Sequence, residues 1–548
     1  MSASPTQLRT MPILWDGDRR PTRKRWHLVL GGALVLVLAA SALSSHSHDS
    51  LTAAARDFVS SSTKSFNFSL HPEAALDRPT VAIAPMERIN AIMRKASGGG
   101  ECGWGVGPRR ESTRSAYREM IASPETDFPY YVTNTDQFAL DDVLTTRFLA
   151  YTKLVPLLSS PAPDFIFLPV LSQIWTNPWG CGSPVLAEGI KETTQFLADV
   201  VHFAGNSTYP RVILPISPIR SQLERGVLTP EFMEEIKDSV VLVSIENAPK
   251  NFAEGMKYTI DVPYPTAFHL SPSHDGNKTS IGTYFSDVDR PYLLHYAGAA
   301  THPWGLPPTD PFNGFALRAV LSQELKAFEK DSGDSTSKII FDEITNSMDG
   351  AQQLDLFHQH MQESTFCLMP AGDSPTRRAT YEALLLGCIP VIFREHSYGR
   401  LFPSSPEIND MSKYTVFVEE NDLINSVGPS LIERLEAIPA SQVRKMQEHI
   451  RRIAPSLQWS FTDREEWFDP TLTSPSADPL PSTLPMFNRT KAIEHERTTP
   501  PLRDAFETLL TELTTIKRGE WIAGVARDNR LGTQEAGSRS RTKMRRLR

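Results

Sequence analysis

Cysteine is scarce in this chain, with four residues among 548. So few cysteines exclude a disulfide-stapled scaffold, and the fold must therefore depend on an ordinary hydrophobic core. Positive charge is not in excess either, because 64 Asp and Glu outnumber 56 Lys and Arg, for a formal net charge of −8. This balance argues against nucleic acid as a general partner. No repeat of solenoid period is visible, and the length predicts two to four globular domains.

Long apolar runs are also rare, and the one at residues 26–43 contains no charged residue. As a helix it spans roughly 27 Å, which matches the thinner membranes of the early secretory pathway. Arginines and a lysine precede it, so the positive-inside rule predicts a cytosolic N-terminus and a luminal body. A signal peptide cleaved after Ala42 is the alternative, but the 25 residues before the run are long for such a peptide. We therefore expect a single-pass signal anchor.

Glycosylation sequences agree with a luminal body, although about two would arise by chance at this composition. Four Asn-X-Ser/Thr sequences are present, at Asn67, Asn206, Asn277 and Asn488.

The cysteines fall into two pairs by context. Cys102 and Cys181 both lie among Gly and Trp residues, and we predict that they form a disulfide. Cys367 and Cys388 lie in two apolar segments of strand length. We interpret them as buried small hydrophobic residues, because cysteine is among the most buried residue types.

Strand-like and helix-like segments alternate in two successive blocks, which implies parallel sheets built from βαβ units. An amphipathic helix is expected at 501–516, folding back onto these blocks. The predicted organisation is a cytosolic tail at 1–25, the transmembrane anchor at 26–43, a stem at 44–100, an N-terminal Rossmann-like acceptor domain at 101–284, a C-terminal Rossmann-like nucleotide-sugar domain at 285–465, a Pro-rich segment with the C-terminal helix at 466–530, and a basic disordered tail at 531–548.

Residues 364–393 carry most of the functional information. Ser364–Met369 has the length and composition of a buried strand, and a dense cluster of turn residues follows it. Ser374 is a candidate N-cap for the next helix, and Gly387 fits the left-handed position that ends it. Cys388–Phe393 then has the composition of a second buried strand. The segment predicts a strand, a turn, a helix and a strand.

Arg377 and Arg378 fall in the first turn of this helix, where its dipole disfavours each cation by roughly 0.3–1 kcal/mol. A bound anion makes these positions favourable for arginine, because backbone N–H groups and guanidinium groups then converge on the anion. Such turns lie at the carboxyl ends of strands, where open α/β sheets bind ligands. We therefore predict a nucleotide diphosphate here. The alternative is that Asp373 and Glu382 simply neutralise the two arginines, with Arg378 and Glu382 forming an i,i+4 pair.

The run FCLMPAGDSPTRR at 366–378, the acid at Glu382 and GCIPV at 387–391 together resemble a stretch of the exostosin family of glycosyltransferases. The closest likeness is to the plant branch that includes xyloglucan galactosyltransferases. Weaker likenesses keep the family's order and extend the resemblance to about residues 125–425. They are DFIFLP at 164–169, VPYPTAFH at 262–269, RPYLLHYAG at 290–298 and Arg318.

The resemblance implies a GT-B fold, in which two Rossmann-like domains face a cleft. It implies inverting transfer of a sugar, with galactose the leading guess, from a UDP-sugar to a polysaccharide or glycoprotein glycan at the Golgi membrane. GT-B enzymes generally stabilise the leaving diphosphate with basic side chains and a helix N-terminus, so no metal or other cofactor is expected. A homo- or hetero-oligomer with other glycosyltransferases is left open.

The expected donor site combines the arginines with the turn before them. Glu382 is expected to accept hydrogen bonds from ribose hydroxyls, and the Gly298 turn to bring backbone close to the nucleotide. For Arg318, a diphosphate contact and a plain surface position are both open. The predicted donor-binding residues are Arg377, Arg378, Glu382, Ser374, Gly372, Arg318 and Gly298.

The catalytic base is harder to assign, because an inverting enzyme needs a group that takes a proton from the acceptor hydroxyl. His269 is the first candidate, since it ends the VPYPTAFH segment; a purely structural histidine is the alternative. Asp164, His302, Glu395 and His396 stay open.

Two other functions stay open as well. Asp287-Val288-Asp289 matches the metal-diphosphate motif of GT-A transferases, but two carboxylates alone do not define a metal site. A non-catalytic exostosin-like subunit that binds glycan or stabilises a partner is the other alternative.

Overall fold

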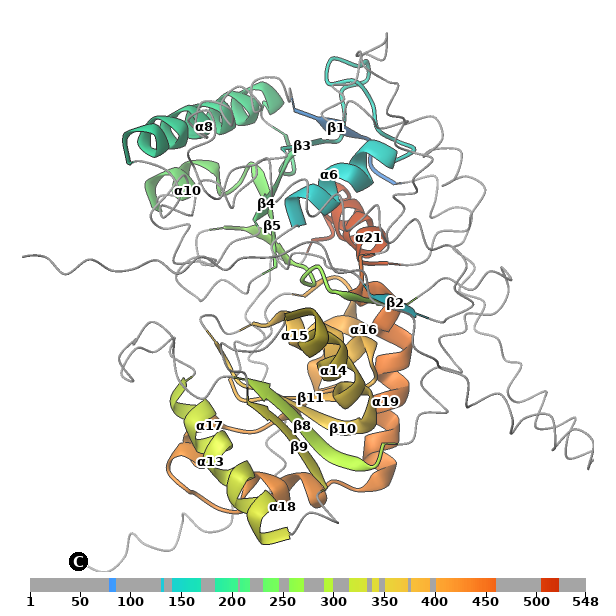
Figure 1. Cartoon of the computed structure of the whole chain (residues 1–548). Helices are drawn as coiled ribbons and strands as arrows, with labels where there is room; N and C mark the ends of the chain where they lie inside the picture. Colours follow the sequence, from blue (N-terminus) through green and yellow to red (C-terminus); the bar gives the residue numbers. More distant parts are fainter. Residues whose placement is uncertain are drawn as a thin grey trace, which may run out of the picture. The chain divides into compact units, whose positions relative to one another are not determined.

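The chain divides into two units, Met1–Glu73 and Ala74–Arg548, and every residue described here belongs to the second (Figure 1). The predicted anchor, the four glycosylation asparagines and the predicted Cys102–Cys181 pair lie outside the described residues. Across the part that is described, no helix has both the length and the apolar character needed to cross a membrane. The computed structural model describes residues 78–84, 130–132, 140–168, 183–205, 207–216, 230–245, 256–270, 290–298, 315–332, 338–343, 350–372, 376–394, 401–459 and 504–521.

The first sheet has five parallel strands in the order β1-β3-β4-β5-β6, so the strands lie in space in the order of the sequence. Every residue in them is buried. Continuous apolar runs of this kind are typical of a parallel sheet covered on both faces. The bounds are β1 Val81–Ile83, β3 Phe165–Phe167, β4 Val212–Ile216, β5 Val240–Ser244 and β6 Tyr258–Asp261, with helices α6 Leu140–Ala150, α8 Ser183–Ala204 and α10 Pro230–Ile236.

The second sheet is also five-stranded and parallel, but its order is β12-β11-β10-β8-β9. The chain passes from β8 to β9 and then returns across β8 to β10, so the strand order reverses between β8 and β10. Such a reversal is the topological switch point at which open α/β sheets bind ligands. The bounds are β8 Tyr292–Gly298, β9 Ile339–Glu343, β10 Ser364–Met369, β11 Ile389–Ile392 and β12 Val416–Phe417, with helices α13 Phe315–Ser332, α14 Gly350–Glu363 and α15 Arg378–Leu385.

Two parallel α/β sheets confirm the fold class expected from the alternating pattern. The predicted stem, however, extends too far. β1 at 81–83 is a buried edge strand of the first sheet, paired with β3, so this domain begins before residue 101. A strand of three residues is too short to give a period, which is why the sequence did not reveal it.

Cys367 and Cys388 form a disulfide, with their Cα atoms 5.8 Å apart. Their interpretation as separate small hydrophobic residues is therefore wrong, although both are fully buried as expected. The reason is the strand pairing, since Phe366 of β10 lies opposite Ile389 of β11. The residues next to this pair come within the range of Cα separations that a disulfide requires, about 4.4–6.8 Å.

The C-terminal helix α21, Ala505–Lys517, confirms the predicted amphipathic helix and its return to the body (Figure 1). Its apolar face is buried, and Phe506 meets Phe148 of α6 with ring centroids 5.0 Å apart. Lys517 donates to Asp164 at 2.9 Å, and Glu512 accepts from the backbone N–H of Ser404 at 3.0 Å. The helix therefore contacts α6 and the residue before β3 in the first domain, and the segment between β11 and β12 in the second.

The segment after β6 runs against the second sheet's helices. It includes β7, Phe268–Leu270, which pairs antiparallel with β2, Tyr130–Val132. Trp459 donates its indole N–H to the carbonyl of Pro263 at 2.9 Å, and the Gln458 amide exchanges hydrogen bonds with the backbone of Leu270. These contacts hold the VPYPTAFH segment against Gln458 and Trp459, and the backbone N–H of Ala267 joins it to Glu382 of α15.

Candidate active site at the strand-order reversal

Arg318 lies against the loop that follows β10. Its Nε donates to the carbonyl of Ala371 at 2.9 Å, and its guanidinium stacks on Phe315, 4.5 Å from the ring centroid. A Cβ added at Gly372 would lie 2.7 Å from Arg318 Nη2. Gly372 therefore leaves the space that Arg318 occupies. The structure brings these two predicted residues together at the switch point.

Arg377 reaches the same loop from the other side. Its Nη1 donates to the carbonyl of Pro370 at 2.9 Å. Arg377 is the N-cap of α15, with φ −149° and ψ 141°, and Arg378 is the first helical residue. The helix thus begins later than predicted, and the proposed cap Ser374 lies outside the described residues.

The first turn of α15 contains no acidic residue, and the N-cap side chain makes no capping hydrogen bond. Two arginines therefore stand at a helix N-terminus whose dipole disfavours cations. An anion bound between the backbone N–H groups and the guanidinium groups would relieve this conflict.

Tyr296 is a residue of this site that the sequence did not indicate. It is fully buried, and its hydroxyl has no hydrogen-bond partner among the described residues. A Cβ at Gly298 would lie 2.5 Å from that hydroxyl, so the ring extends along β8 over its last residue. Burial raises the pKa of Tyr296, while the positive charges of Arg318 and Arg377 oppose the rise. The hydroxyl has no described partner and is affected by the charges of two cations, so an anion bound near them could accept its hydrogen bond.

Arg378 and Glu382 form the i,i+4 pair that was the alternative to an anion site, with Nε and Oε1 3.2 Å apart. Glu382 is buried, and its Oε1 also accepts from the backbone N–H of Ala267 at 3.1 Å. Burial raises the pKa of Glu382, but Arg378 and His358 outweigh it and lower the value to about 2. The carboxylate thus joins α15 to the VPYPTAFH segment, and its contact with ribose stays a prediction.

His269 lies in β7 and is fully buried. Burial lowers its pKa to about 3, although hydrogen bonding with Thr266 and the charge of Glu382 act in the opposite direction. A base with so low a pKa accepts a proton poorly near neutral pH. The role of His269 stays a prediction.

Asp164, an alternative base, is engaged in structural contacts. Its Oδ2 accepts from the backbone N–H of Thr80 at 2.7 Å and from Lys517 at 2.9 Å. Its pKa is lowered, because hydrogen bonds with Thr80 and Lys517 outweigh the effect of burial. The remaining alternatives, His302, Glu395 and His396, and the Asp287-Val288-Asp289 motif lie outside the described residues.

Metal-ligating geometry occurs once among the described residues, in His295, Asp342 and His360. None of the three belongs to the anion site, and the expectation that donor binding needs no metal stays a prediction.

In open α/β sheets a switch point is where ligands bind, and the arginines at this one favour an anionic ligand. Residues 222–435 match the Exostosin GT47 domain. This match confirms the resemblance to the exostosin family over these residues.

Three relatives from Arabidopsis thaliana are similar over longer or shorter stretches. Xyloglucan galactosyltransferase MUR3 is 27% identical over 64% of this chain and 52% of its own length. Probable xyloglucan galactosyltransferase GT13 is 26% identical over 64% of this chain and 70% of its own. Xyloglucan-specific galacturonosyltransferase 1 is 28% identical over 44% of this chain and 33% of its own length. The chain thus spans about half the length of the first relative, and the three support the predicted class, a glycosyltransferase.

Two solved structures are distantly similar. A UDP-N-acetylglucosamine 2-epimerase has a TM-score of 0.23 and 10% identity, over 59% of this chain and 92% of that one. AviGT4, a glycosyltransferase involved in avilamycin A biosynthesis, has a TM-score of 0.22 and 11% identity, over 69% of this chain and 90% of its own.

Proposed function

We propose that this protein is an inverting glycosyltransferase that moves a sugar from a UDP-sugar to a polysaccharide or glycoprotein glycan. The observation that carries the proposal is the reversal between β8 and β10, where Arg318, Arg377 and the unpaired Tyr296 hydroxyl converge within an exostosin GT47 domain. Relatives named xyloglucan galactosyltransferases support galactose as the donor sugar and a polysaccharide as the acceptor.

The chemistry requires stabilisation of the leaving group. As the bond to the sugar breaks, negative charge builds on the UDP diphosphate, and donors already aimed at it lower the barrier. Arg318 and Arg377 supply fixed positive charge, and Tyr296 supplies an O–H donor. Hydrogen bonds already hold Arg318 to Ala371 and Arg377 to Pro370, so little reorganisation is needed when the diphosphate binds.

The second sheet takes the donor in this proposal, and the first domain takes the acceptor across a GT-B cleft. The backbone contact between Ala267 and Glu382 would then set the acceptor-side segment at a fixed distance from the donor helix. We further propose a single-pass Golgi protein anchored by residues 26–43 with a luminal body. The buried Cys367–Cys388 disulfide supports this, because disulfides persist in oxidising compartments.

The test is UDP release by the full-length chain across a panel of UDP-sugars, with xyloglucan oligosaccharides as acceptor and with EDTA added in parallel. We expect turnover of one donor, resistance to EDTA, and loss of turnover in Arg377→Ala. Lys338→Ala is the matched control, because it removes an exposed cation of the same domain that pairs with Glu436. A chain that binds no UDP at all contradicts the proposal.

A non-catalytic subunit that binds the nucleotide or glycan is the second candidate. The burial and low pKa of His269 favour it, because no described residue is shown to act as base. This candidate predicts UDP binding that Arg377→Ala weakens, without turnover of any donor or acceptor.

A further inference from the structure

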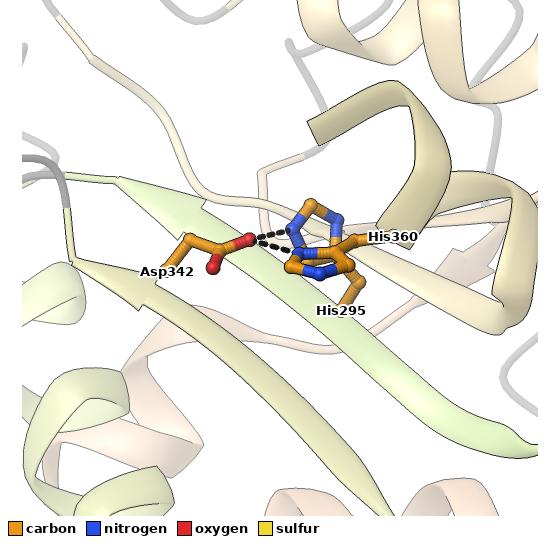
Figure 2. Close-up of side chains that lie close together, drawn as sticks. All are labelled: His295, Asp342 and His360. Carbon is orange, nitrogen blue, oxygen red and sulfur yellow. Dashed lines mark hydrogen bonds and ion pairs between the residues drawn. The ribbon is translucent and has the colours of Figure 1, made fainter. Parts of the chain in front are cut away.

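Three side chains from separate elements converge on the second sheet: His295 of β8, Asp342 of β9 and His360 of α14 (Figure 2). Each offers one ligand atom, and the three atoms all lie within 4.8 Å of one another. Asp342 Oδ2 is 2.9 Å from His295 Nε2 and 2.7 Å from His360 Nδ1. We propose that these residues bind one zinc ion.

The geometry is close to what the ion needs. Ligand atoms at about 2.0–2.1 Å from a tetrahedral zinc lie roughly 3.4 Å from one another. The oxygen–nitrogen separations of 2.9 and 2.7 Å must therefore widen by roughly 0.5 and 0.7 Å. Rotations of the side chains supply this change, because Asp342 and His360 keep 16% and 18% of their surface exposed.

The chemistry favours a borderline transition metal. Two imidazole nitrogens and one carboxylate oxygen form a frequent three-residue zinc set, in which the fourth position is left for water or another group. Hard cations such as Mg²⁺ prefer oxygen ligands and near-octahedral geometry. An ionised carboxylate between two neutral rings carries one net negative charge, and a dication compensates it.

The fold holds the three residues in place independently of any ion. β8 and β9 are paired in register, with His295 opposite Ile340 and Ala297 opposite Asp342. His295 is buried, and α14 places His360 beside it, with ring centroids 5.7 Å apart. The ion would thus join the edge strand β9 and helix α14 to β8.

The zinc site is separate from the donor site. Successive residues of a strand point to opposite faces of the sheet, so His295 and Tyr296 lie on different faces of β8. His295 meets His360 of α14, whereas Tyr296 is affected by the charge of Arg318 on α13. The ion therefore has a structural role, and its loss should leave UDP binding in place.

The experiment uses the full-length chain. The protein is stripped with a chelator and titrated with ZnCl₂, and bound zinc and the thermal midpoint are measured for wild type, His360→Gln and Asp342→Asn. His202→Gln, which replaces an exposed histidine of α8, controls for zinc bound at other histidines. We expect both site variants to bind one zinc fewer per chain than wild type and His202→Gln. Saturating zinc should raise the wild-type midpoint by about 3 °C.

Equal zinc content and equal midpoint shifts in wild type and both site variants would overturn the proposal. If either variant fails to fold, Co²⁺ added to the stripped wild-type chain replaces it as probe. A visible d–d spectrum of a tetrahedral nitrogen–oxygen site that zinc displaces supports the proposal, and an octahedral spectrum contradicts it. UDP binding is measured alongside, so that failure of the zinc site is distinguished from failure of the glycosyltransferase proposal.

Discussion

The two sheets are built from the same parts but differ in strand order. Both have five parallel strands, yet the first follows the sequence along its width and the second reverses between β8 and β10. Where the order reverses, the loops after two neighbouring strands diverge and leave room for a ligand. Arg318, Arg377 and the unpaired Tyr296 hydroxyl lie there. Strand order, more than composition, thus distinguishes the candidate donor domain.

The second sheet also contains a disulfide bond, and we expect its removal to have the largest effect on stability. Cys367 and Cys388 brace β10 and β11 of the second sheet. Replacing both with alanine should destabilise the protein by about 3 kcal/mol, because the loop of the unfolded chain is no longer closed. Hydrogen exchange should show faster opening of β10 and β11 than in wild type, with β3–β5 less affected. An equal loss of protection in both sheets would mean that the two domains unfold as one unit.

We expect the next largest effect when one guanidinium group at the strand-order reversal, that of Arg377, is removed. Arg377→Ala should weaken UDP binding by about 2 kcal/mol, roughly 30-fold, because charge-assisted hydrogen bonds to the diphosphate are lost. Calorimetric titration measures this, with Lys338→Ala as the control that should bind like wild type. Equal weakening in both variants would indicate only a general effect of charge.

Two buried carboxylates, Glu382 and Glu512, should change stability with pH in opposite directions. Glu382 has Arg378 beside it, whereas the partners of Glu512 in the described part of the chain are Ser404 and Ser405. Burial raises the pKa of Glu512 to about 7 despite these hydrogen bonds. Because the folded pKa of Glu512 lies above its unfolded value, its stabilising contribution is present below about pH 4.5 and is lost as the pH rises through about 7. Glu382 behaves oppositely, losing its contribution as the pH falls from 4.5 towards 2.

Glu512→Gln should therefore gain stability relative to wild type as the pH rises from 6 to 8, by about 1–2 kcal/mol. Chemical denaturation at several pH values measures the difference. A constant difference between the two proteins across this range would show that Glu512 stays ionised in the folded state.

The smallest expected effect is at Tyr296. Tyr296→Phe should weaken UDP binding about fivefold, the value of one neutral hydrogen bond. It should leave the stability of the ligand-free protein unchanged or higher, because the hydroxyl it removes has no partner among the described residues. Thermal unfolding and UDP titration of the same samples test both points. A loss of stability without weaker binding would mean that the hydroxyl serves the core.

Local patterns in the sequence were sufficient to predict much of the second sheet. The predicted strand at 364–369 has the bounds of β10, and Gly387 takes the left-handed conformation expected of it, with φ 74°. Turn residues and apolar runs act over a few positions, so a single sequence shows them.

Features that depend on distant contacts could not be predicted. The Cys367–Cys388 disulfide depends on the pairing of β10 with β11. His295, Asp342 and His360 meet only because β9 and α14 flank β8. The ion pair of Glu382 with Arg378 follows from helical spacing, but the hydrogen bond from the backbone of Ala267 to Glu382 does not. The donor arginines, by contrast, stood out because two cations at a helix start conflict with the dipole.

The central claim is that the reversal between β8 and β10 binds the diphosphate of a UDP-sugar. A crystal structure of the full-length chain with UDP tests it most directly. The account predicts diphosphate oxygens within hydrogen-bond distance of Arg377 and of the Tyr296 hydroxyl. A diphosphate bound at the first sheet, or one that contacts neither residue, would contradict it.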